Sequence, residues 1–281
     1  MSSSTSSHYA VFGLPIAHSR SPDIHATFAR QFDMQIDYRR IECPISEFAQ
    51  RIVTFAVDGG RGANLTLPLK EIAAGFCNDV SRRARRAGSV NTLTRDGDGW
   101  FGDSTDGEGL LVDLRNRHDL ELRGARVLII GAGGAARAAA AALLDTGIDE
   151  LTVANRDLSR AQKLCAEIDP RGRSIACDLA ALETGSGFDL LINATSAGHG
   201  GEHPVVPDGL IGRRTVAYDL SYGAAAQPFL DWARAAGAAR AIDGLGMLVE
   251  QAAASFAIWH GDVPFTETVY REQRDALDRG G

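Results

Sequence analysis

The stretch Arg-Val-Leu-Ile-Ile-Gly-Ala-Gly-Gly-Ala-Ala at residues 126–136 decides the fold of this chain. Its first five residues form an apolar run typical of a strand buried on both faces of a parallel sheet. The next six match G-x-G-x-x-G/A, in which Gly131 allows a tight turn, Gly133 lets the backbone approach a pyrophosphate, and Ala136 permits close helix packing. The helix that follows offers free N–H groups and a positive dipole end. The stretch therefore predicts a dinucleotide-binding turn, with a glycine turn used only for packing as the alternative.

The residues that follow the strand pattern at 150–154 indicate which dinucleotide binds. An NAD site usually has an acidic residue about twenty residues beyond the turn, where it binds the ribose 2′-hydroxyl. Here the strand is followed by Asn155, Arg156 and Asp157, and Arg160 lies one helical turn later. Two guanidinium groups suit a 2′-phosphate, so the sequence predicts NADP over NAD. Asp157 opposes this prediction, because its carboxylate would repel the phosphate or pair with one of the arginines.

Strand and helix patterns alternate along both halves of the chain, as in α/β proteins. Beyond residue 136 they predict a small doubly wound sheet, with strands at 150–154, 189–193 and 215–220 and helices at 159–168 and 228–236. Before residue 107 they predict a second α/β region, with strands at 9–12, 36–43 and 63–67, helices at 24–32 and 45–57, and a further helix opened by Pro68.

A hairpin is expected where Asp96-Gly97-Asp98-Gly99 separates two strand patterns, since D-G dipeptides favour tight turns. A helix at 107–115 should then connect the two regions. The last helix patterns, at 247–259 and 265–277, have no strand of their own and are expected to pack back on the first region. The predicted fold class is α/β with two domains and a tail: residues 8–106 with 245–281 as a discontinuous substrate-binding catalytic domain, 107–244 as the nucleotide-binding domain, and 1–7 as a disordered serine-rich tail.

Composition limits the classes of partner. The chain has 281 residues, 44% hydrophobic and 23% charged, which is enough for two cores, and its net charge of -7 opposes nucleic-acid binding. The four cysteines include no C-x-x-C pair, so no metal site or disulfide framework is expected. The N-terminal serines do not resemble a signal peptide, and the most apolar stretch, 135–144, is too short to cross a membrane. A cytoplasmic monomer or homodimer without membrane or nucleic-acid partners is expected.

A series of polar residues falls at the ends of predicted strands or in the loops that follow them. Such loop ends are where ligands of α/β proteins bind, although each residue alone is more often a helix cap or turn residue. Hydroxyl and amide groups in this number suit a substrate with several hydroxyl groups, because each buried polar group needs a partner. The series consists of Ser19, Ser21, Asn64, Thr66, Lys70, Asn91, Thr105 and Asp106.

Lys70 is the member of this series best suited to proton transfer. An ammonium group is already competent to donate a proton to a ketone oxygen as that ketone is reduced and to stabilise the developing alkoxide. A neighbouring Asp106 would favour the charged form of the lysine. On spacing alone, a surface lysine early in a helix is an equally good interpretation.

With these motifs in place, the chain resembles the shikimate dehydrogenase family over nearly its whole length after the tail. Eight ordered segments carry the likeness: 17–22 (AHSRSP), 62–70 (GANLTLPLK), 90–92 (VNT), 104–107 (STDG), 131–135 (GAGGA), 155–156 (NR), 192–196 (INATS) and 243–251 (DGLGMLVEQ). The resemblance implies reversible reduction of 3-dehydroshikimate to shikimate with NADPH, on a catalytic domain followed by a Rossmann-like NADP-binding domain.

The resemblance also implies roles for individual residues. Lys70 and Asp106 become the catalytic pair, Ser19 and Ser21 hold the substrate carboxylate, and Tyr222 lies near that carboxylate and the nicotinamide. The residues implied to bind the ring hydroxyls are Asn64, Thr66, Asn91, Asp106 and Gln251. The residues implied to bind the cofactor are Gly131, Ala132, Gly133, Gly134, Ala135, Asn155, Arg156, Arg160, Thr195, Leu220 and Gly244.

Two departures from the family pattern leave alternatives open. Asp157 stands where biosynthetic members commonly have threonine, which weakens the NADP assignment, and Leu220 replaces a methionine that often packs near the nicotinamide. The nearest alternative is a quinate/shikimate dehydrogenase that uses NAD or NADP. An alternative of another class is a non-catalytic NADP-binding sensor, which would have no need to retain both Lys70 and Asp106.

Overall fold

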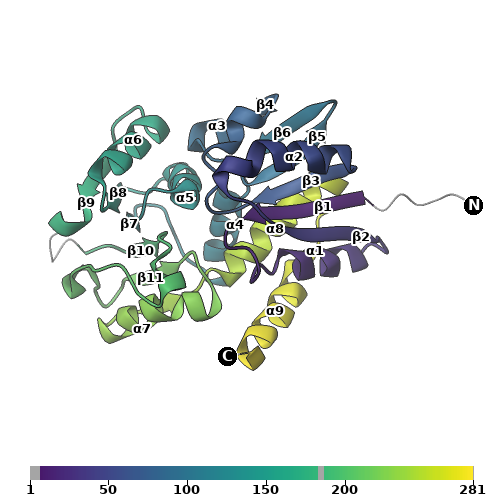
Figure 1. Cartoon of the computed structure of the whole chain (residues 1–281). Helices are drawn as coiled ribbons and strands as arrows, with labels where there is room; N and C mark the ends of the chain where they lie inside the picture. The colour runs from purple at the N-terminus through teal and green to yellow at the C-terminus, as the bar shows by residue number, and fades with distance from the viewer. Residues whose placement is uncertain (1–6, 183–186, 281) are drawn as a thin grey trace, which may run out of the picture.

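The computed structural model describes residues 7–182 and 187–280, which form two six-stranded sheets with helices packed on them (Figure 1). The first sheet has the strand order β2-β1-β3-β5-β6-β4 and the second the order β12-β11-β10-β7-β8-β9. The strands of the first sheet are β1 (Ser7–Gly13), β2 (Ile36–Glu42), β3 (Gly60–Leu65), β4 (Asp79–Val80), β5 (Thr92–Asp96) and β6 (Gly99–Asp103). Those of the second are β7 (Arg126–Ile130), β8 (Glu150–Asn155), β9 (Ser174–Asp178), β10 (Leu190–Asn193), β11 (Val216–Asp219) and β12 (Arg240–Ile242).

The first sheet is mixed. β1 pairs in parallel with β2 and β3, whereas β5 runs antiparallel to both β3 and β6. The predicted hairpin is confirmed, because Asp96 pairs with Gly99 and the connecting Gly97 has a φ of 54°, which a glycine adopts without strain. Ser7 corrects the predicted tail, because it pairs with Ile36 as the first residue of β1. The rest of that tail, residues 1–6, lies outside the described residues.

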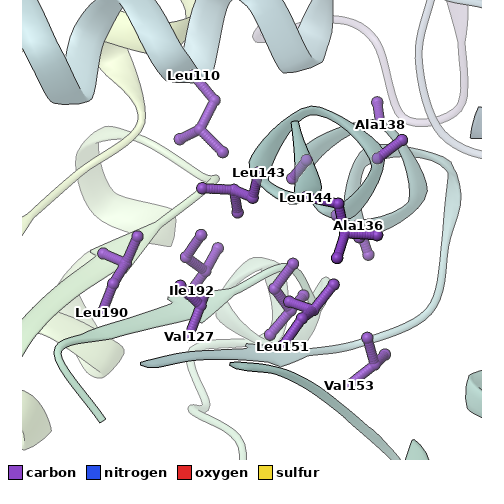
Figure 2. Packing of buried hydrophobic residues seen from close by; sticks show 14 of the residues in the cluster. Leu110, Val127, Ala136, Ala138, Leu143, Leu144, Leu151, Val153, Leu190 and Ile192 are labelled. Atoms are coloured by element: carbon purple, nitrogen blue, oxygen red, sulfur yellow. The ribbon is translucent and has the colours of Figure 1, made fainter. Parts of the chain in front are cut away.

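The second sheet is parallel throughout and doubly wound, as predicted. Its core lies between β7, β8, β10 and helix α5 (Gly134–Leu144), where Figure 2 shows the side chains of Val127, Leu151 and Ile192 facing Leu143. All four are fully buried. The small side chains of α5, mostly alanine, let this helix lie close to the strands.

The other helices are α1 (Ser21–Arg30), α2 (Phe48–Val57), α3 (Arg82–Ala87), α4 (Asp106–Val112), α6 (Leu158–Ile168), α7 (Gln227–Ala235), α8 (Leu245–His260) and α9 (Thr266–Gly280). In the described part of the chain, no helix combines the length and hydrophobicity that a bilayer crossing needs. The expected helix at Pro68 is wrong. Residues 66–72 form turns instead. The carbonyl oxygens of Lys70 and Leu67 accept hydrogen bonds from the N–H groups of Val90 and Leu14, and these tertiary hydrogen bonds hold the segment.

Helices α4 and α8 join the two sheets (Figure 1). A Cβ at Gly107 of α4 would lie 2.6 Å from the carbonyl oxygen of Ala138 in α5, and a Cβ at Gly109 would lie 2.6 Å from the backbone nitrogen of Gln251 in α8. The two glycines therefore let α4 pack closely on helices from both sides. Further along, α8 packs on α1 through a cluster that includes Phe28 and Phe256.

Candidate active site

An ion pair between Lys70 and Asp106 lies at the centre of the predicted polar series. The Nζ of Lys70 is 2.7 Å from Oδ2 of Asp106, and their side chains are 16% and 4% exposed. Lys70 lies in the turn after β3, and Asp106 is the first residue of α4, where the positive end of the helix dipole favours a charged carboxylate. The structure thus places a shielded ammonium group, with a small opening to solvent, beside a fixed carboxylate.

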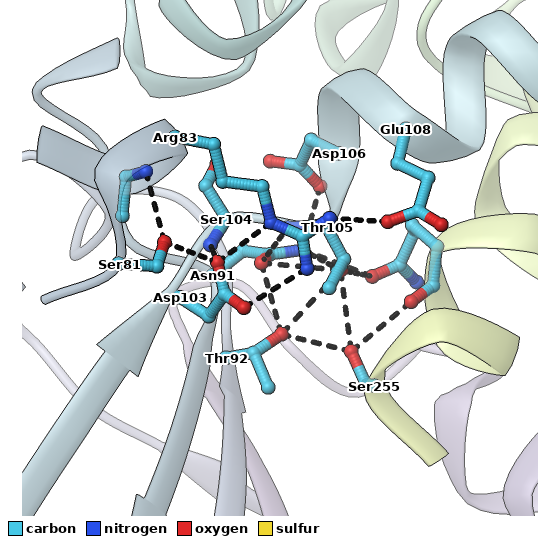
Figure 3. A network of polar contacts seen from close by, with 12 residues as sticks. Ser81, Arg83, Asn91, Thr92, Asp103, Ser104, Thr105, Asp106, Glu108 and Ser255 are labelled. Carbon is cyan, nitrogen blue, oxygen red and sulfur yellow. Dashed lines mark hydrogen bonds and ion pairs between the residues drawn. The ribbon is translucent and has the colours of Figure 1, made fainter. Parts of the chain in front are cut away.

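Asn91 is the hub that connects this pair to the rest of the site (Figure 3). Its Nδ2 donates to Oδ1 of Asp106 at 2.9 Å, to Oγ1 of Thr105 at 2.8 Å and to Oε1 of Gln251 at 3.1 Å. Its Oδ1 accepts from the backbone N–H of Thr105 at 2.7 Å. Asp106 is therefore held at both carboxylate oxygens, one by Asn91 and the other by Lys70, which leaves the lysine a single orientation toward it.

Two residues of this network were not predicted from the sequence. Thr92 and Ser255 share a hydrogen bond of 2.8 Å, and the Nδ2 of Asn64 donates to Oγ of Ser255 at 3.0 Å. Ser255 lies four residues after Gln251, so both project from one face of α8. That i,i+4 spacing is the signal by which Ser255 was detectable, whereas Thr92 looks like an ordinary strand residue.

The residues expected to hold a carboxylate lie beside this network. Ser19 and Ser21 follow β1, and the Oγ of Ser19 lies 3.3 Å from that of Ser21. The Tyr222 hydroxyl reaches the backbone of Arg20, and burial raises the pKa of Tyr222, so it stays a neutral hydroxyl. Thr66 follows β3, and a Cβ on Gly13 would lie 2.3 Å from its Cγ2, so the two strand ends are in close contact.

An ion pair braces the segment that leads into α4. Arg83 donates to both carboxylate oxygens of Asp103, at 2.7 and 2.9 Å, and Asp103 accepts the backbone N–H of Ser104 at 2.7 Å (Figure 3). Burial alone would raise the pKa of Asp103, but the hydrogen bonds from Arg83 and Ser81 hold that pKa below its usual value. Asp103 is thus charged at neutral pH and fixes the backbone just before Asp106.

The glycine turn has the geometry that a pyrophosphate requires. Gly131 has a φ of 113°, and a Cβ there would lie 2.9 Å from the carbonyl oxygen of Ala194. At Gly133 a Cβ would meet nothing nearer than an oxygen of Glu71, 3.9 Å away, so the backbone is open on that side. No side chain caps the N-terminus of α5, so its first N–H groups are available to an anion. These features fit a dinucleotide.

The turn also lies against the segment that contains Lys70. A Cβ at Gly134 would lie 2.6 Å from Cβ of Lys70 and 3.1 Å from Oγ of Ser89. A larger residue at Gly134 would thus push the two apart. A cofactor on the turn therefore lies beside the lysine.

The residues predicted to select the cofactor lie at and just after the end of β8. Arg156 is exposed there, and Arg160 donates to Oε1 of Glu71 at 2.9 Å. Asp157 caps α6, accepting from the N–H and hydroxyl of Ser159 at 3.0 and 2.6 Å, and it also accepts the backbone N–H of Arg160. The hydrogen bond from Ser159 lowers the pKa of Asp157. Asn155 donates to the backbone oxygen of Asp157 at 2.9 Å, which steadies the turn.

The remaining predicted cofactor residues, Thr195, Leu220 and Gly244, follow β10, β11 and β12. The N–H of Thr195 donates to Oδ1 of Asn193 at 3.1 Å, and a Cβ at Gly244 would lie 2.5 Å from the carbonyl oxygen of Leu220, so these loops are tightly packed. Asp219 sits beneath them, and burial raises its pKa to about 6. Among the described residues, no group of three or more His, Cys, Asp or Glu is arranged to hold a metal ion.

Three family models match the chain. The shikimate dehydrogenase substrate binding domain matches residues 11–93, the shikimate / quinate 5-dehydrogenase model matches 114–210, and the shikimate 5′-dehydrogenase C-terminal domain matches 244–272. The chain is 53% identical over 267 residues to a shikimate dehydrogenase (NADP(+)) from Stenotrophomonas maltophilia strain K279a, an alignment that covers 95% of each protein.

Solved structures agree with this similarity. A shikimate 5-dehydrogenase from Thermus thermophilus, in complex with NADP(H) and shikimate, is 31% identical with a TM-score of 0.81 and covers 96% of this chain and 99% of its own. An Ael1 enzyme from Pseudomonas putida is 40% identical with a TM-score of 0.85, covering 95% of this chain and 98% of its own. Similarity thus extends over both sheets and the helices that join them.

Proposed function

The chain belongs to the shikimate dehydrogenase family, and from this premise we propose that Lys70 and Asp106 are its catalytic pair. Its activity is the reversible NADP-dependent reduction of 3-dehydroshikimate to shikimate, a step of aromatic amino-acid biosynthesis. The observation that carries the proposal is the 2.7 Å ion pair of Lys70 and Asp106, placed beside the nucleotide turn at Gly134.

Lys70 donates the proton that reduction requires. NADPH, when bound on the turn, supplies the hydride to the carbonyl carbon of the substrate. The ammonium group of Lys70 gives its proton to the carbonyl oxygen as negative charge develops there, which leaves a neutral amine and an alcohol. The 16% exposure of the Lys70 side chain lets that amine regain a proton from solvent. In the reverse direction the neutral amine accepts the hydroxyl proton.

Asp106 orients the lysine and binds a ring hydroxyl. Its carboxylate is fixed by Asn91 at 2.9 Å and holds Nζ of Lys70 at 2.7 Å. Asn64, Thr66, Asn91 and Gln251 supply the other groups for ring hydroxyls, and Ser19, Ser21 and Tyr222 bind the carboxylate. This division is supported by the hydrogen bonds that join Asn64 and Gln251 to Asn91 and by the separate position of the serines after β1.

We assign the cofactor contacts to the turn and to the loops beside it. Gly131, Ala132, Gly133, Gly134 and Ala135 surround the pyrophosphate, while Thr195, Leu220 and Gly244 lie by the nicotinamide, and Asn155, Arg156 and Arg160 lie by the 2′-phosphate. Arg156→Ala should raise the KM for NADP about tenfold or more and leave that for NAD nearly unchanged, since a charged hydrogen bond to phosphate is lost. Steady-state kinetics with both cofactors measures this. Equal changes would make Arg156 a structural residue.

The domain division also follows from the arrangement of the sheets. We propose residues 8–106 with 245–281 as the catalytic domain and 107–244 as the NADP-binding domain, supported by the packing of α8 on α1 and by the separate second sheet. A cytoplasmic location and a monomeric or homodimeric state are part of the same proposal. Analytical ultracentrifugation tests the oligomeric state.

The activity is tested by assaying shikimate and quinate oxidation with NADP and with NAD. The expected result is the highest kcat/KM for shikimate with NADP. Comparable values for quinate, or for NAD, would favour the quinate/shikimate dehydrogenase alternative. Inactivity with all four pairs would leave only a non-catalytic NADP-binding sensor.

A further inference from the structure

Tyr38 of β2 lies between two of the proposed substrate-binding residues. Its hydroxyl donates to Oδ1 of Asn64 at 2.7 Å, and its second polar neighbour is the side chain of Ser21. Ser21 belongs to the proposed carboxylate site and Asn64 to the proposed hydroxyl site. No motif of the sequence marks Tyr38, and the proposed mechanism does not use it. Its hydroxyl nevertheless joins both halves of the substrate site.

The hydrogen bond from Tyr38 fixes which way the amide of Asn64 points. The Nδ2 of Asn64 faces three acceptors: the carbonyl oxygen of Asn91 at 3.2 Å, Oγ1 of Thr92 at 3.3 Å and Oγ of Ser255 at 3.0 Å. In the flipped orientation, the amide oxygen would face the carbonyl oxygen of Asn91, and the amide nitrogen would face a phenol that must then turn its proton away. The donor on Tyr38 and the acceptor on Asn91 therefore select one orientation.

This orientation determines what Asn64 offers to a ligand. The amide oxygen has two lone pairs, and Tyr38 occupies one of them. The amide hydrogens are engaged by the network that contains Ser255. His25 also lies close to Asn64, but neither of its ring nitrogens makes a hydrogen bond of normal geometry, so the second lone pair on Oδ1 is the group that Asn64 has left for a ligand, and it suits a hydroxyl that donates.

Packing holds the ring of Tyr38 in place. The imidazole of His25, fully buried in α1, stacks on it with centroids 4.5 Å apart and planes 13° apart. Behind His25 lie Phe28 and Trp259, with ring centroids at 6.0 and 5.2 Å. Burial also raises the pKa of Tyr38, so its hydroxyl remains a donor across the working pH range.

We propose that Tyr38 is a positioning residue for substrate binding: it holds Asn64 with the amide oxygen available to a ring hydroxyl of the substrate. The inference rests on the proposed function, since it assumes that Asn64 binds the ring. Tyr38 acts through Asn64 and takes no part in proton transfer at Lys70. Its loss therefore weakens the binding of the hydroxylated ring and leaves the chemical step in place.

The experiment is a double-mutant cycle of Tyr38→Phe and Asn64→Ala, with steady-state kinetics for shikimate and NADP. Tyr38→Phe retains the ring and its stacking on His25 and removes the hydroxyl, with its contacts to Asn64 and Ser21. It should raise the KM for shikimate about tenfold, leave kcat within about twofold and leave the KM for NADP unchanged, as expected when binding common to ground and transition states is lost. In the Asn64→Ala background, Tyr38→Phe should raise the KM for shikimate by much less, at most about twofold, because only the contact with Ser21 is then lost.

Tyr270→Phe is the matched control, because its hydroxyl lies on α9 and contacts Arg274 at 3.4 Å. It should leave both KM values unchanged. An unchanged KM for shikimate in Tyr38→Phe, or an effect that simply adds to that of Asn64→Ala, overturns the inference about Tyr38 while the proposed function stands. A wild-type protein that does not oxidise shikimate overturns both.

Discussion

At Lys70 the structure holds the side chain in one position. Asn91 binds Asp106, and Asp106 holds Nζ of Lys70 at 2.7 Å, so Nζ is already in position before substrate binds. Pre-ordering of this kind lowers the barrier of the chemical step more than it tightens substrate binding. The two proposed catalytic residues should therefore differ in their effects on kcat and KM from the residues proposed only to bind the ring.

Lys70→Ala should lower kcat by about 10²- to 10⁴-fold, the usual range for loss of a general acid, and change the KM for shikimate only a few-fold. Stopped-flow or steady-state assays of NADPH formation measure both. Lys163→Ala is the matched control, since that lysine is exposed and its nearest carboxylate, on Glu167, is 4.0 Å away. A kcat within tenfold of the wild-type value would remove Lys70 from the proton-transfer role.

His25 makes folding sensitive to acid. Burial lowers its pKa from 6.5 to about 3, with a smaller opposing contribution from Asn64. Below pH 6.5 the unfolded chain gains a proton that the folded chain does not accept, so stability falls as the pH drops from about 6.5 toward 3. The loss at pH 5 is about 2 kcal/mol from this group alone.

His25→Phe keeps an aromatic ring in the cluster and removes the titration. The free energy of unfolding, measured in urea at pH 7.5 and pH 5, should fall less on acidification in this variant than in the wild type, by about 2 kcal/mol. Burial also lowers the pKa of His260, so some acid sensitivity should remain. An identical loss of stability in both proteins would show that His25 is protonated in the folded state.

Individual residues of the site were predictable where a motif or a strand end marked them. Asn91 and Asp106 fall at such ends, and the structure joins them by a hydrogen bond. Tyr38 and Thr92 were not predictable, because their roles arise from contacts between β2, β3 and β5 that no local pattern encodes. Asp157 illustrates a third case: its position suggested repulsion of a phosphate, but the carboxylate caps a helix.

Among the elements, α4 depends most on the absence of side chains. Gly109→Ala would place a methyl group 2.6 Å from the backbone nitrogen of Gln251 and 2.8 Å from the carbonyl oxygen of Met247, so α4 and α8 must separate. Such overpacking typically costs about 1–3 kcal/mol. It should also move Gln251 away from Asn91, which it meets at 3.1 Å, and raise the KM for shikimate.

Thermal unfolding and shikimate kinetics check this prediction together. Gly75→Ala is the control, because a Cβ there has no heavy atom within 4 Å. The control should leave Tm and KM unchanged, whereas Gly109→Ala should lower the first and raise the second. A stable Gly109→Ala protein with normal KM would mean that α8 shifts without disturbing the site.

The elements themselves were predicted best where the pattern was long and well bounded. The apolar run of β7 and the turn before α5 needed no tertiary information. By contrast, β4 has two residues and β12 three, and they exist through pairing with β6 and β11. The expected helix at Pro68 failed because hydrogen bonds to other strands and loops outweighed the local preference.

At the scale of the whole molecule, side-chain contacts across the site connect the parts of the chain that carry the two sheets. Arg160 of the second sheet's α6 pairs with Glu71, the residue after Lys70, and Tyr222 reaches the backbone of Arg20. The Glu71–Arg160 pair is exposed, so it contributes little to stability. Its importance lies in its position, because the carboxylate of Glu71 would compete for the guanidinium group of Arg160 with the 2′-phosphate that we propose Arg160 binds.

Glu71→Gln should therefore lower the KM for NADP by about two- to fivefold, since an exposed ion pair is worth about 0–1 kcal/mol and its loss frees Arg160 for the phosphate. The KM for NAD should not change, because NAD has no 2′-phosphate, and in an Arg160→Ala background the substitution should have no effect. Glu47→Gln, which removes a surface pair with Arg51 away from the site, is the control. A parallel fall in KM for both cofactors would indicate relief of repulsion at the pyrophosphate instead, since Glu71 also lies 3.9 Å from the Cβ position of Gly133.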